Sequence, residues 1–341
     1  MTTAILAKEA LLPDGWRNDV RVTFAGAVID SVTVAATPRP GDHRVQALIP
    51  GMANLHSHTF QRGMAGLAEQ RGAAVDSFWT WRDMMYRFAL ALAPDEVQAV
   101  AEMAAMEMLE AGFTRLGEFH YLHHAPDGRP YADPSELSQR ILAAAMATGI
   151  HLTLLPVFYA HSDFGGKAPL AAQRRFLHDI DGFCRLTERM RAALTRPGDR
   201  IGIAPHSLRA VTEADLSRLL DAHPEGPVHI HIAEQMREVE DCLAAMGQRP
   251  VQLLLSRFPV DARWCLIHAT HLTGAERQGI AASGAVCGLC PVTEANLGDG
   301  LFPASDFLSE GGRIGIGTDS NVAISLTGEL RMLEYGQRLL H

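Results

Sequence analysis

The sequence predicts an α/β fold, a (β/α)8 TIM barrel preceded by a small N-terminal β-sandwich subdomain. From residue 48 onward, eight apolar runs of strand length alternate with helical stretches, the pattern of parallel strands joined by helices. Residues 1–46 contain only short strand-like runs and turns. Histidines and carboxylates follow several later runs, at the strand ends where such barrels carry their sites. We therefore divide the chain into a subdomain, 1–47, and a barrel, 48–341.

The N-terminal subdomain is predicted from three apolar or β-branched runs, at 4–6, 20–24 and 27–34. Asp14-Gly15 and Ala25-Gly26 mark turns between them, and a loop with two prolines spans 37–41. These runs are too short to enclose a sizeable core by themselves.

The barrel is predicted from strands and helices in strict alternation. The strand-like runs are residues 48–56, 114–120, 150–158, 201–206, 228–233, 264–268, 285–289 and 314–318. The helical stretches include residues 94–111, 134–148, 170–194, 212–222, 251–258 and 274–282. The alternative is an open, doubly wound sheet. No glycine-rich phosphate loop follows the first strand, and this favours the barrel.

Composition and charge limit the possible partners and compartment. The 341 residues are 47% hydrophobic, which suffices for one large core and a small accessory domain. A net charge of −9 argues against a nucleic-acid or anionic-membrane partner. The five cysteines are scattered and imply no disulfide framework. We find neither a signal peptide nor a run of about 18 apolar residues, and we expect a cytoplasmic protein.

A His-x-His pair follows the first predicted barrel strand. Side chains alternate faces along a strand, so His56 and His58 point the same way and can bind one metal ion. The pair alone is weak evidence, because two histidines at a strand end can simply be surface residues. Later strand ends supply further candidate ligands, His231 on the fifth strand and Asp319 after the eighth. Such residues lie far apart in sequence and close together in a closed barrel.

The fifth strand offers a choice between two histidines. His229 shares a strand face with His231, but His231 also places Glu234 just beyond it, so we prefer His231 as the ligand. We expect His229 to be a buried, hydrogen-bonded histidine one layer further down the barrel.

The predicted ligands suit hydrolysis of a C=N or C=O bond. A bound divalent ion lowers the pKa of its water to about 7. Asp319 is placed to take the proton of this water, Glu234 to carry a proton to the leaving nitrogen, and His268 to stabilise the attacking water or the tetrahedral intermediate. Other roles remain open, since Glu234 also suits a solvated helix start and Asp319 a helix cap. A bridging carboxylated lysine would indicate two metals, but the fourth strand has no lysine and Lys167 lies well upstream. We therefore expect one ion.

These motifs resemble the amidohydrolase superfamily, and in particular its mononuclear deaminase branch. The resemblance rests on Pro-Gly-Met-Ala-Asn-Leu-His56-Ser-His58, His231-Ile-Ala-Glu234, His268 and Gly-Thr-Asp319-Ser. Within that branch the chain resembles the N-formimino-L-glutamate deiminases of histidine degradation. The segments that carry this closer resemblance are His58-Thr-Phe-Gln61-Arg-Gly-Met64, Phe78-Trp-Thr-Trp-Arg82, Glu118-Phe-His-Tyr121, His206-Ser-Leu-Arg209 and Cys290-Pro-Val-Thr-Glu-Ala-Asn-Leu-Gly-Asp299-Gly.

The resemblance implies one Zn²⁺ per chain, a homodimer, and release of ammonia from formiminoglutamate to leave N-formyl-L-glutamate. By matching position, the substrate contacts would be Gln61, Arg82, Tyr121, His206 and Arg209. Two arginines and neutral donors at the strand ends suit the two carboxylates of this substrate. The alternatives are a related deaminase acting on guanine or another heterocycle, and a barrel relative without catalysis.

The sequence departs from the family in one respect. The family continues beyond the eighth strand with helices and with strands that complete the small sandwich, whereas this sequence stops at residue 341, within the predicted eighth helix that begins near Thr327. We therefore expect the C-terminal part of the family fold to be absent and the strands of the N-terminal subdomain to show an open edge.

Overall fold

The structure is a computed structural model, and it describes residues 4–26, 28–69 and 78–341. The chain forms two compact units, Met1–Met52 and Ala53–His341. The predicted boundary after residue 47 lies five residues before this division. The predicted run 27–34 begins outside the described residues.

The first unit contains one four-stranded sheet in the order β3-β2-β1-β4. Its strands are β1 (Ala4–Leu12), β2 (Gly15–Ala25), β3 (Val28–Thr33) and β4 (His43–Leu48). β1 pairs with β2 antiparallel and with β4 parallel, and a small core forms around Ala7, Ala10, Val20 and Val22. Among the described residues, β3 and β4 are each paired on one side only, as an open edge requires.

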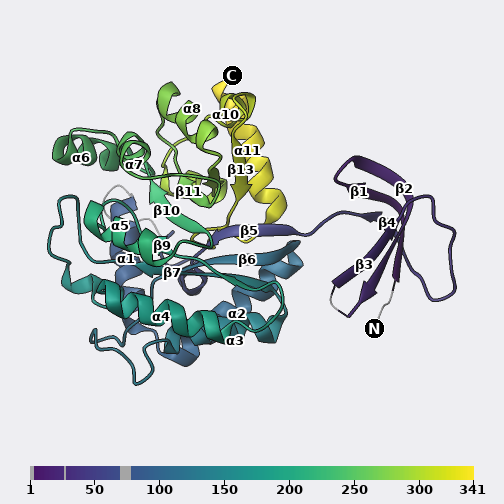
Figure 1. Ribbon diagram of the computed structural model, residues 1–341, viewed down its shortest axis with the longest axis horizontal. Helices are drawn as coiled ribbons and strands as arrows, with labels where there is room; N and C mark the ends of the chain where they lie inside the picture. Colours follow the sequence, from purple (N-terminus) through teal and green to yellow (C-terminus); the bar gives the residue numbers. More distant parts are fainter. Residues whose placement is uncertain (1–3, 27, 70–77) are drawn as a thin grey trace. The chain divides into compact units, whose positions relative to one another are not determined.

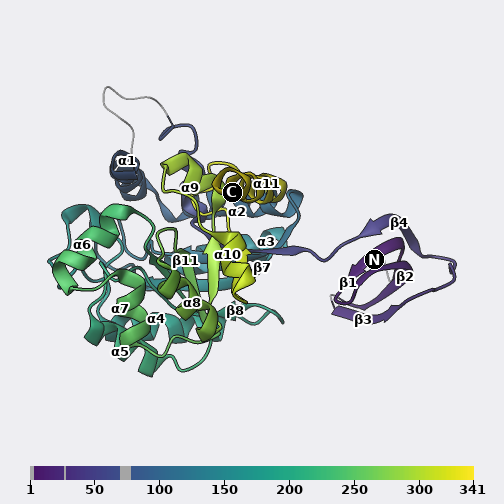
Figure 2. The same cartoon turned by 90° about the horizontal axis from the view of Figure 1, so that it is seen from above.

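The second unit is a ring of parallel strands with helices outside it (Figures 1 and 2). The strands are β5 (Met52–Ser57), β6 (Phe113–His120), β7 (His151–Phe158), β8 (Arg200–Ile201), β9 (Ala204–Pro205), β10 (Val228–Ile232), β11 (Trp264–His268), β12 (Val286–Leu289) and β13 (Arg313–Ile316). β5–β8 form one sheet and β10–β13 another. Single bridges join the two sheets, Ser57 to Asp319 and Ile203 to Val228. Because β8 and β9 share the fourth position, the ring has eight strand positions, and the predicted TIM barrel is confirmed.

The first barrel strand is shorter than predicted. The apolar run 48–56 contains Pro50-Gly51, which interrupts the strand, so residues 43–48 pair in the first unit and β5 begins at Met52. The fourth strand, predicted over 201–206, is divided at residues 202–203 into two short strands that both pair with β7.

The helices are α1 (Phe78–Ala91), α2 (Pro94–Glu110), α3 (Glu136–Thr148), α4 (Ile180–Ala193), α5 (Glu213–Ala222), α6 (Met236–Met246), α7 (Pro250–Arg257), α8 (Gly274–Ser283), α9 (Pro291–Leu297), α10 (Ala304–Ser309) and α11 (Leu326–Leu340), with 3-10 turns at Thr59–Met64 and Ala171–Gln173. The predicted helix 170–194 is therefore too long at its start, where a 3-10 turn precedes α4. Asp179 caps α4 by accepting a hydrogen bond from the Gly182 N–H. Within the described residues, no helix is long and apolar enough to cross a membrane.

Glycines bring the strands next to β5 into close contact with it. A Cβ on Gly117 would lie 2.5 Å from the carbonyl oxygen of Leu55, and one on Gly317 would lie 2.6 Å from that of His56. Both distances are far below van der Waals contact, so only glycine fits. These contacts fix the position of the strand that carries the His-x-His pair.

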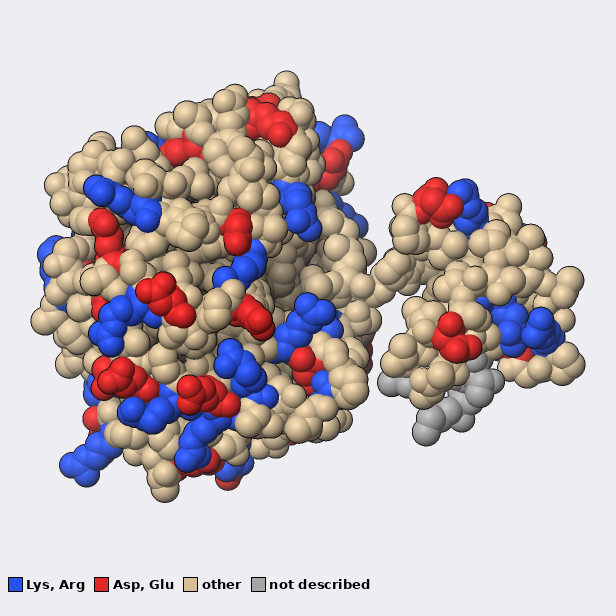
Figure 3. All heavy atoms as spheres, in the orientation of Figure 1, with Lys and Arg blue, Asp and Glu red and all other residues tan. Residues whose placement is uncertain are grey.

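Basic and acidic side chains are interspersed on the face of the barrel unit that Figure 3 shows. Ion pairs of this unit include Arg140 with Glu136 and Arg277 with Glu310.

Candidate metal centre and active site

Four side chains from three strand ends meet inside the barrel. His56 lies at the end of β5, His58 follows it, His231 lies on β10 and Asp319 follows β13. Each offers one ligand atom, and these atoms all lie within 4.8 Å of one another. Nε2 of His56 is 3.1 Å from Nε2 of His231 and 3.4 Å from Oδ1 of Asp319, and Nε2 of His58 is 3.3 Å from the same oxygen.

This arrangement fits a divalent metal. A tetrahedral ion with ligands at about 2.0–2.1 Å separates its ligand atoms by roughly 3.3 Å, which matches the observed spacing. All four side chains are buried. Burial lowers the pKa of His56 to about 3 and also lowers that of His231. Burial opposes ionisation of Asp319, but hydrogen bonds with His56 and His58 leave its pKa well below the usual value. Neutral imidazoles and an ionised carboxylate are the forms that bind metal.

Backbone carbonyls orient two of the histidines. Nδ1 of His58 lies 2.9 Å from the Phe119 oxygen, and Nδ1 of His231 lies 3.1 Å from the His206 oxygen. Each contact fits an Nδ1–H donor, which leaves Nε2 free to ligate. Asp319 has a φ of 47°, and its N–H donates to the His56 oxygen. The Asp319 backbone, in this left-handed turn, therefore lies beside β5.

Glu234 and His268 lie beside the four candidate ligands. Nε2 of His268 is 3.8 Å from Oε1 of Glu234 and 3.8 Å from Oδ2 of Asp319. Burial raises the pKa of Glu234 to about 7. Burial disfavours the charged form of His268, yet the carboxylates of Glu234, Glu294 and Asp319 raise its pKa well above the ordinary value. The predicted proton-transfer groups are therefore adjacent to the predicted metal ligands.

Two acidic residues of this site were not assigned roles from the sequence. Glu294, in α9, lies 3.2 Å from Nδ1 of His268 and accepts a hydrogen bond from the Cys290 N–H. Asp299 contacts the amide of Gln235, and burial raises its pKa to about 9. Both lie within the quoted segment that starts at Cys290, but only the fold shows that α9 turns back toward His268. His268, Cys290 and Glu294 also form a second group of possible ligands, in which Glu294 is already engaged with the other two.

The five predicted substrate contacts all line a cavity next to the metal ligands. Its volume is about 60 Å³, and its walls include Gln61, Arg82, Tyr121, His206 and Arg209. The Gln61 amide donates to the Tyr121 hydroxyl, and Arg82 lies 5.7 Å from the centre of the Tyr86 ring. The Nε of Arg209 is buried without a hydrogen-bond partner, so it is placed to donate to a ligand.

The structure separates the two histidines of the fifth strand. His231 joins the metal group, and His229 lies nearer the start of β10, with its side chain in another cavity. His229 is buried one layer further down the barrel, as expected, but its Nδ1 has no hydrogen-bond partner among the described residues.

Comparisons with known proteins agree with this geometry. The model of the Amidohydrolase family matches residues 47–341. The chain belongs to the amidohydrolase family, whose members share the barrel and depend on a metal. More particularly, residues 2–46 match the N-terminal domain of formimidoylglutamate deiminase HutF. The chain is 53% identical over 339 residues to the formimidoylglutamate deiminase of Pseudomonas aeruginosa, covering 99% of this chain and 75% of that protein.

Solved structures show the same fold. An amidohydrolase from Brucella melitensis is 57% identical, with a TM-score of 0.97, and the match covers 99% of this chain and 76% of that one. A guanine deaminase from C. acetobutylicum with bound guanine is 16% identical, with a TM-score of 0.80 over 99% of this chain and 80% of that one. At this identity the second match concerns the fold alone.

Proposed function

We propose that this protein is a zinc-dependent formimidoylglutamate deiminase of histidine degradation. It hydrolyses the amidine of N-formimino-L-glutamate to give N-formyl-L-glutamate and ammonia. The observation that carries the proposal is the buried group of His56, His58, His231 and Asp319, with Glu234 and His268 beside it. The 53% identity to a formimidoylglutamate deiminase supports the choice of substrate.

Three side chains, those of Asp319, Glu234 and His268, each take a different part in the proposed proton transfers. His56, His58, His231 and Asp319 would hold a divalent ion, which would lower the pKa of a bound water to about 7 and so provide a nucleophile for the amidine carbon near neutral pH. Asp319, ionised in the folded protein, accepts a proton from this water. Glu234, with a pKa of about 7, carries a proton to the nitrogen that leaves as ammonia. His268, held by Glu294, donates to the oxygen on which charge develops.

The cavity walls hold the two carboxylates of the substrate. Arg209 presents a buried guanidinium nitrogen without a partner, and Arg82 lines the same cavity. Charge-assisted hydrogen bonds from arginine to carboxylate are strong and directional. With the carboxylates held there, the amidine at the other end of the molecule reaches the metal ligands. Gln61, Tyr121 and His206 supply neutral hydrogen-bonding groups between these two ends.

Three further parts of the proposal rest on the resemblance to formimidoylglutamate deiminases and on the donor set. Three imidazoles and one carboxylate favour zinc, with one ion per chain. The resemblance supports a homodimer and a cytoplasmic location. We keep the division into a subdomain, 1–47, and a barrel, 48–341, as part of the same proposal.

The substrate assignment is tested by ammonia release from formiminoglutamate and from guanine under the same conditions. We expect turnover of formiminoglutamate and negligible release from guanine, because the cavity carries arginines suited to carboxylates. Faster deamination of guanine would overturn the substrate and leave the metal site standing.

A further inference from the structure

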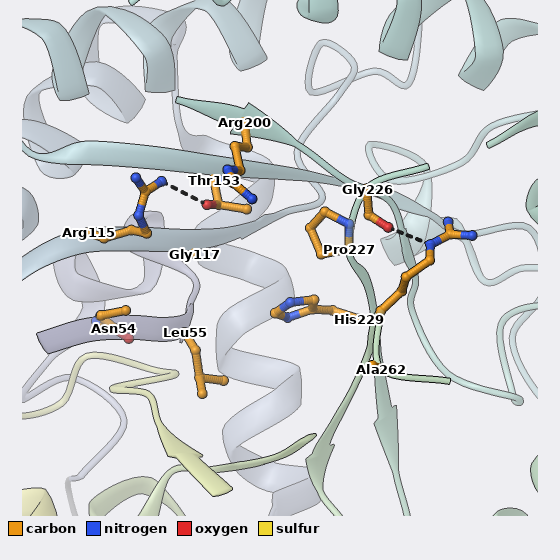
Figure 4. Close-up of a pocket in the computed structure, with 12 residues that line it drawn as sticks. Asn54, Leu55, Arg115, Gly117, Thr153, Arg200, Gly226, Pro227, His229 and Ala262 are labelled. Carbon is orange, nitrogen blue, oxygen red and sulfur yellow. Dashed lines mark hydrogen bonds between the residues drawn. The ribbon is translucent and has the colours of Figure 1, made fainter. Parts of the chain in front are cut away.

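A second cavity lies at the opposite end of the barrel from the candidate metal centre (Figure 4). Its volume is about 510 Å³. It is formed by the first residues of the strands or the residues just before them, among them Asn54, Arg115, Thr153, Arg200, His229 and Arg263. His229 and His231 are two residues apart on β10, so about 6–7 Å of strand separates the two sites.

The lining of the cavity carries positive charge. Arg115, Arg200 and Arg263 line it, and no carboxylate is among the lining residues that the structure describes. Arg115 donates to the Thr153 hydroxyl at 3.2 Å and to the Gly198 oxygen at 2.8 Å, and Arg263 donates to the oxygens of Gly226 and His223. Carbonyl and hydroxyl groups therefore hold these two guanidiniums in place without cancelling their charge.

The charges at the cavity also act on one another. Burial lowers the pKa of Arg115, and the charge of Arg200 lowers it further, whereas the nearby carboxylate of Asp199 raises it. Asp199 is itself paired with Arg196 and does not line the cavity. Arg200 itself is exposed at the start of β8. Two like charges held at one cavity are destabilising unless an anion lies between them or solvent screens them.

His229 adds a polar atom that lacks a partner. The residue is 7% exposed, and its Nδ1 is buried without a hydrogen bond. Figure 4 shows its ring directed into the space bordered by Arg115, Thr153 and Pro227. Buried polar groups are nearly always paired in folded proteins, so an unpaired nitrogen on a ring that lines a cavity is a group that a ligand in the cavity could pair with.

We propose that this cavity binds a small metabolite through its oxyanion group, a carboxylate or a phosphate, at a site separate from the metal centre. Arg115 and Arg200 provide the charge, and Thr153 and His229 provide further hydrogen bonds. Since Thr153 accepts a bond from Arg115, its own hydroxyl hydrogen is free to donate to the anion. The proposal does not depend on the identity of the substrate at the other end of the barrel.

The test measures binding of inorganic phosphate and of glutarate to the zinc-loaded, full chain by titration calorimetry. Arg200→Met removes an exposed charge, and its matched control is Arg313→Met, which removes an exposed charge at the start of β13 outside the cavity. A third variant, Arg209→Met, removes one of the two arginines that line the metal-side cavity, so that weaker binding in this variant reveals glutarate bound there. Melting temperatures confirm that each variant is folded.

We expect one of the two probes to bind with a Kd of about 1 mM or lower. Arg200→Met should weaken this binding about tenfold or more, the effect of losing a charge-assisted hydrogen bond, whereas Arg313→Met and Arg209→Met should leave it unchanged. Whichever probe binds identifies the oxyanion. The proposal is wrong if neither probe binds, or if binding survives Arg200→Met and is lost in Arg209→Met.

Discussion

Glu234 is the residue on which the proposed proton transfer depends most. It is buried 3.8 Å from His268, and its raised pKa keeps a proton available near neutral pH. Glu234→Gln keeps the shape of the side chain and removes its acid–base function. We expect turnover of formiminoglutamate to fall about 10²-fold or more, with zinc content unchanged. Glu240→Gln, an exposed residue of α6, is the matched control. Near-normal turnover in Glu234→Gln would show that the proton takes another route.

In the proposed function, Arg209 binds a carboxylate of the substrate. Its Nε is buried, lacks a partner and faces the metal-side cavity. We expect Arg209→Met to raise KM for formiminoglutamate and to lower kcat/KM by about 10²-fold, since roughly 3 kcal/mol of charge-assisted bonding is lost. Steady-state kinetics and zinc analysis measure both effects, with exposed Arg257→Met as control. Unchanged kcat/KM would remove Arg209 from the substrate site.

The residues of the site differ in how well the sequence reveals them. His56, His58, His231 and Asp319 follow predicted strands, and a closed barrel brings strand ends together, so their meeting could be anticipated. Glu294 could not, because it reaches His268 through α9, a short helix whose direction depends on packing. The unpaired Nδ1 of His229 is likewise a property of the fold, since a strand pattern gives the face of a residue and not its partners.

At the scale of elements, the close contact between β5 and the chain that follows β13 depends on glycine. Gly317 precedes the turn that carries Asp319, and a Cβ there would lie 2.6 Å from the His56 oxygen. We expect Gly317→Ala to destabilise the fold by about 1–3 kcal/mol or more and to weaken zinc binding, because β5 and the Asp319 turn must separate. Gly274→Ala, at the start of α8 with no atom near the added Cβ, should leave both unchanged. Thermal melting with zinc titration checks this, and equal melting temperatures for the two variants would contradict the close contact.

Helix α11 carries a buried carboxyl group whose ionisation opposes folding. Glu329 accepts a hydrogen bond from the Val292 N–H, and burial raises its pKa from 4.5 to about 8. Because the folded pKa exceeds the unfolded one, its contribution is complete below about pH 4.5 and is lost as pH rises toward 8. We expect the wild type to lose stability between pH 6 and 8 and Glu329→Gln to lose less. Denaturant unfolding across that range measures the difference, and parallel pH profiles would exclude the role of Glu329.

The elements themselves were partly predictable. The apolar runs, and the turn residues between them, located the barrel strands to within a few residues. The predicted strand 48–56 includes Pro50-Gly51, although these two residues separate β4 from β5. Helices α1, α6, α9 and α10 were not among the predicted stretches. Of these, α9 and α10 are short and carry little periodic signal.

At the scale of the whole molecule, the barrel carries two candidate sites at opposite strand ends. The metal group joins β5, β10 and the turn after β13, which belong to both parallel sheets. Because the ion contacts strands distant in sequence, it would stabilise the folded barrel over the unfolded chain. Among the described residues that line the cavity at the other end are arginines and no carboxylate, so it would take a different kind of ligand.

The central claim is that one zinc ion, held by His56, His58, His231 and Asp319, supports hydrolysis of formiminoglutamate. Titration of zinc into the metal-free protein, with ammonia release measured at each addition, tests it most directly. The account predicts that activity rises in proportion to zinc, reaches its plateau at one ion per chain, and is not restored in His231→Ala. A plateau at two ions per chain, or full activity before any zinc is added, would contradict it.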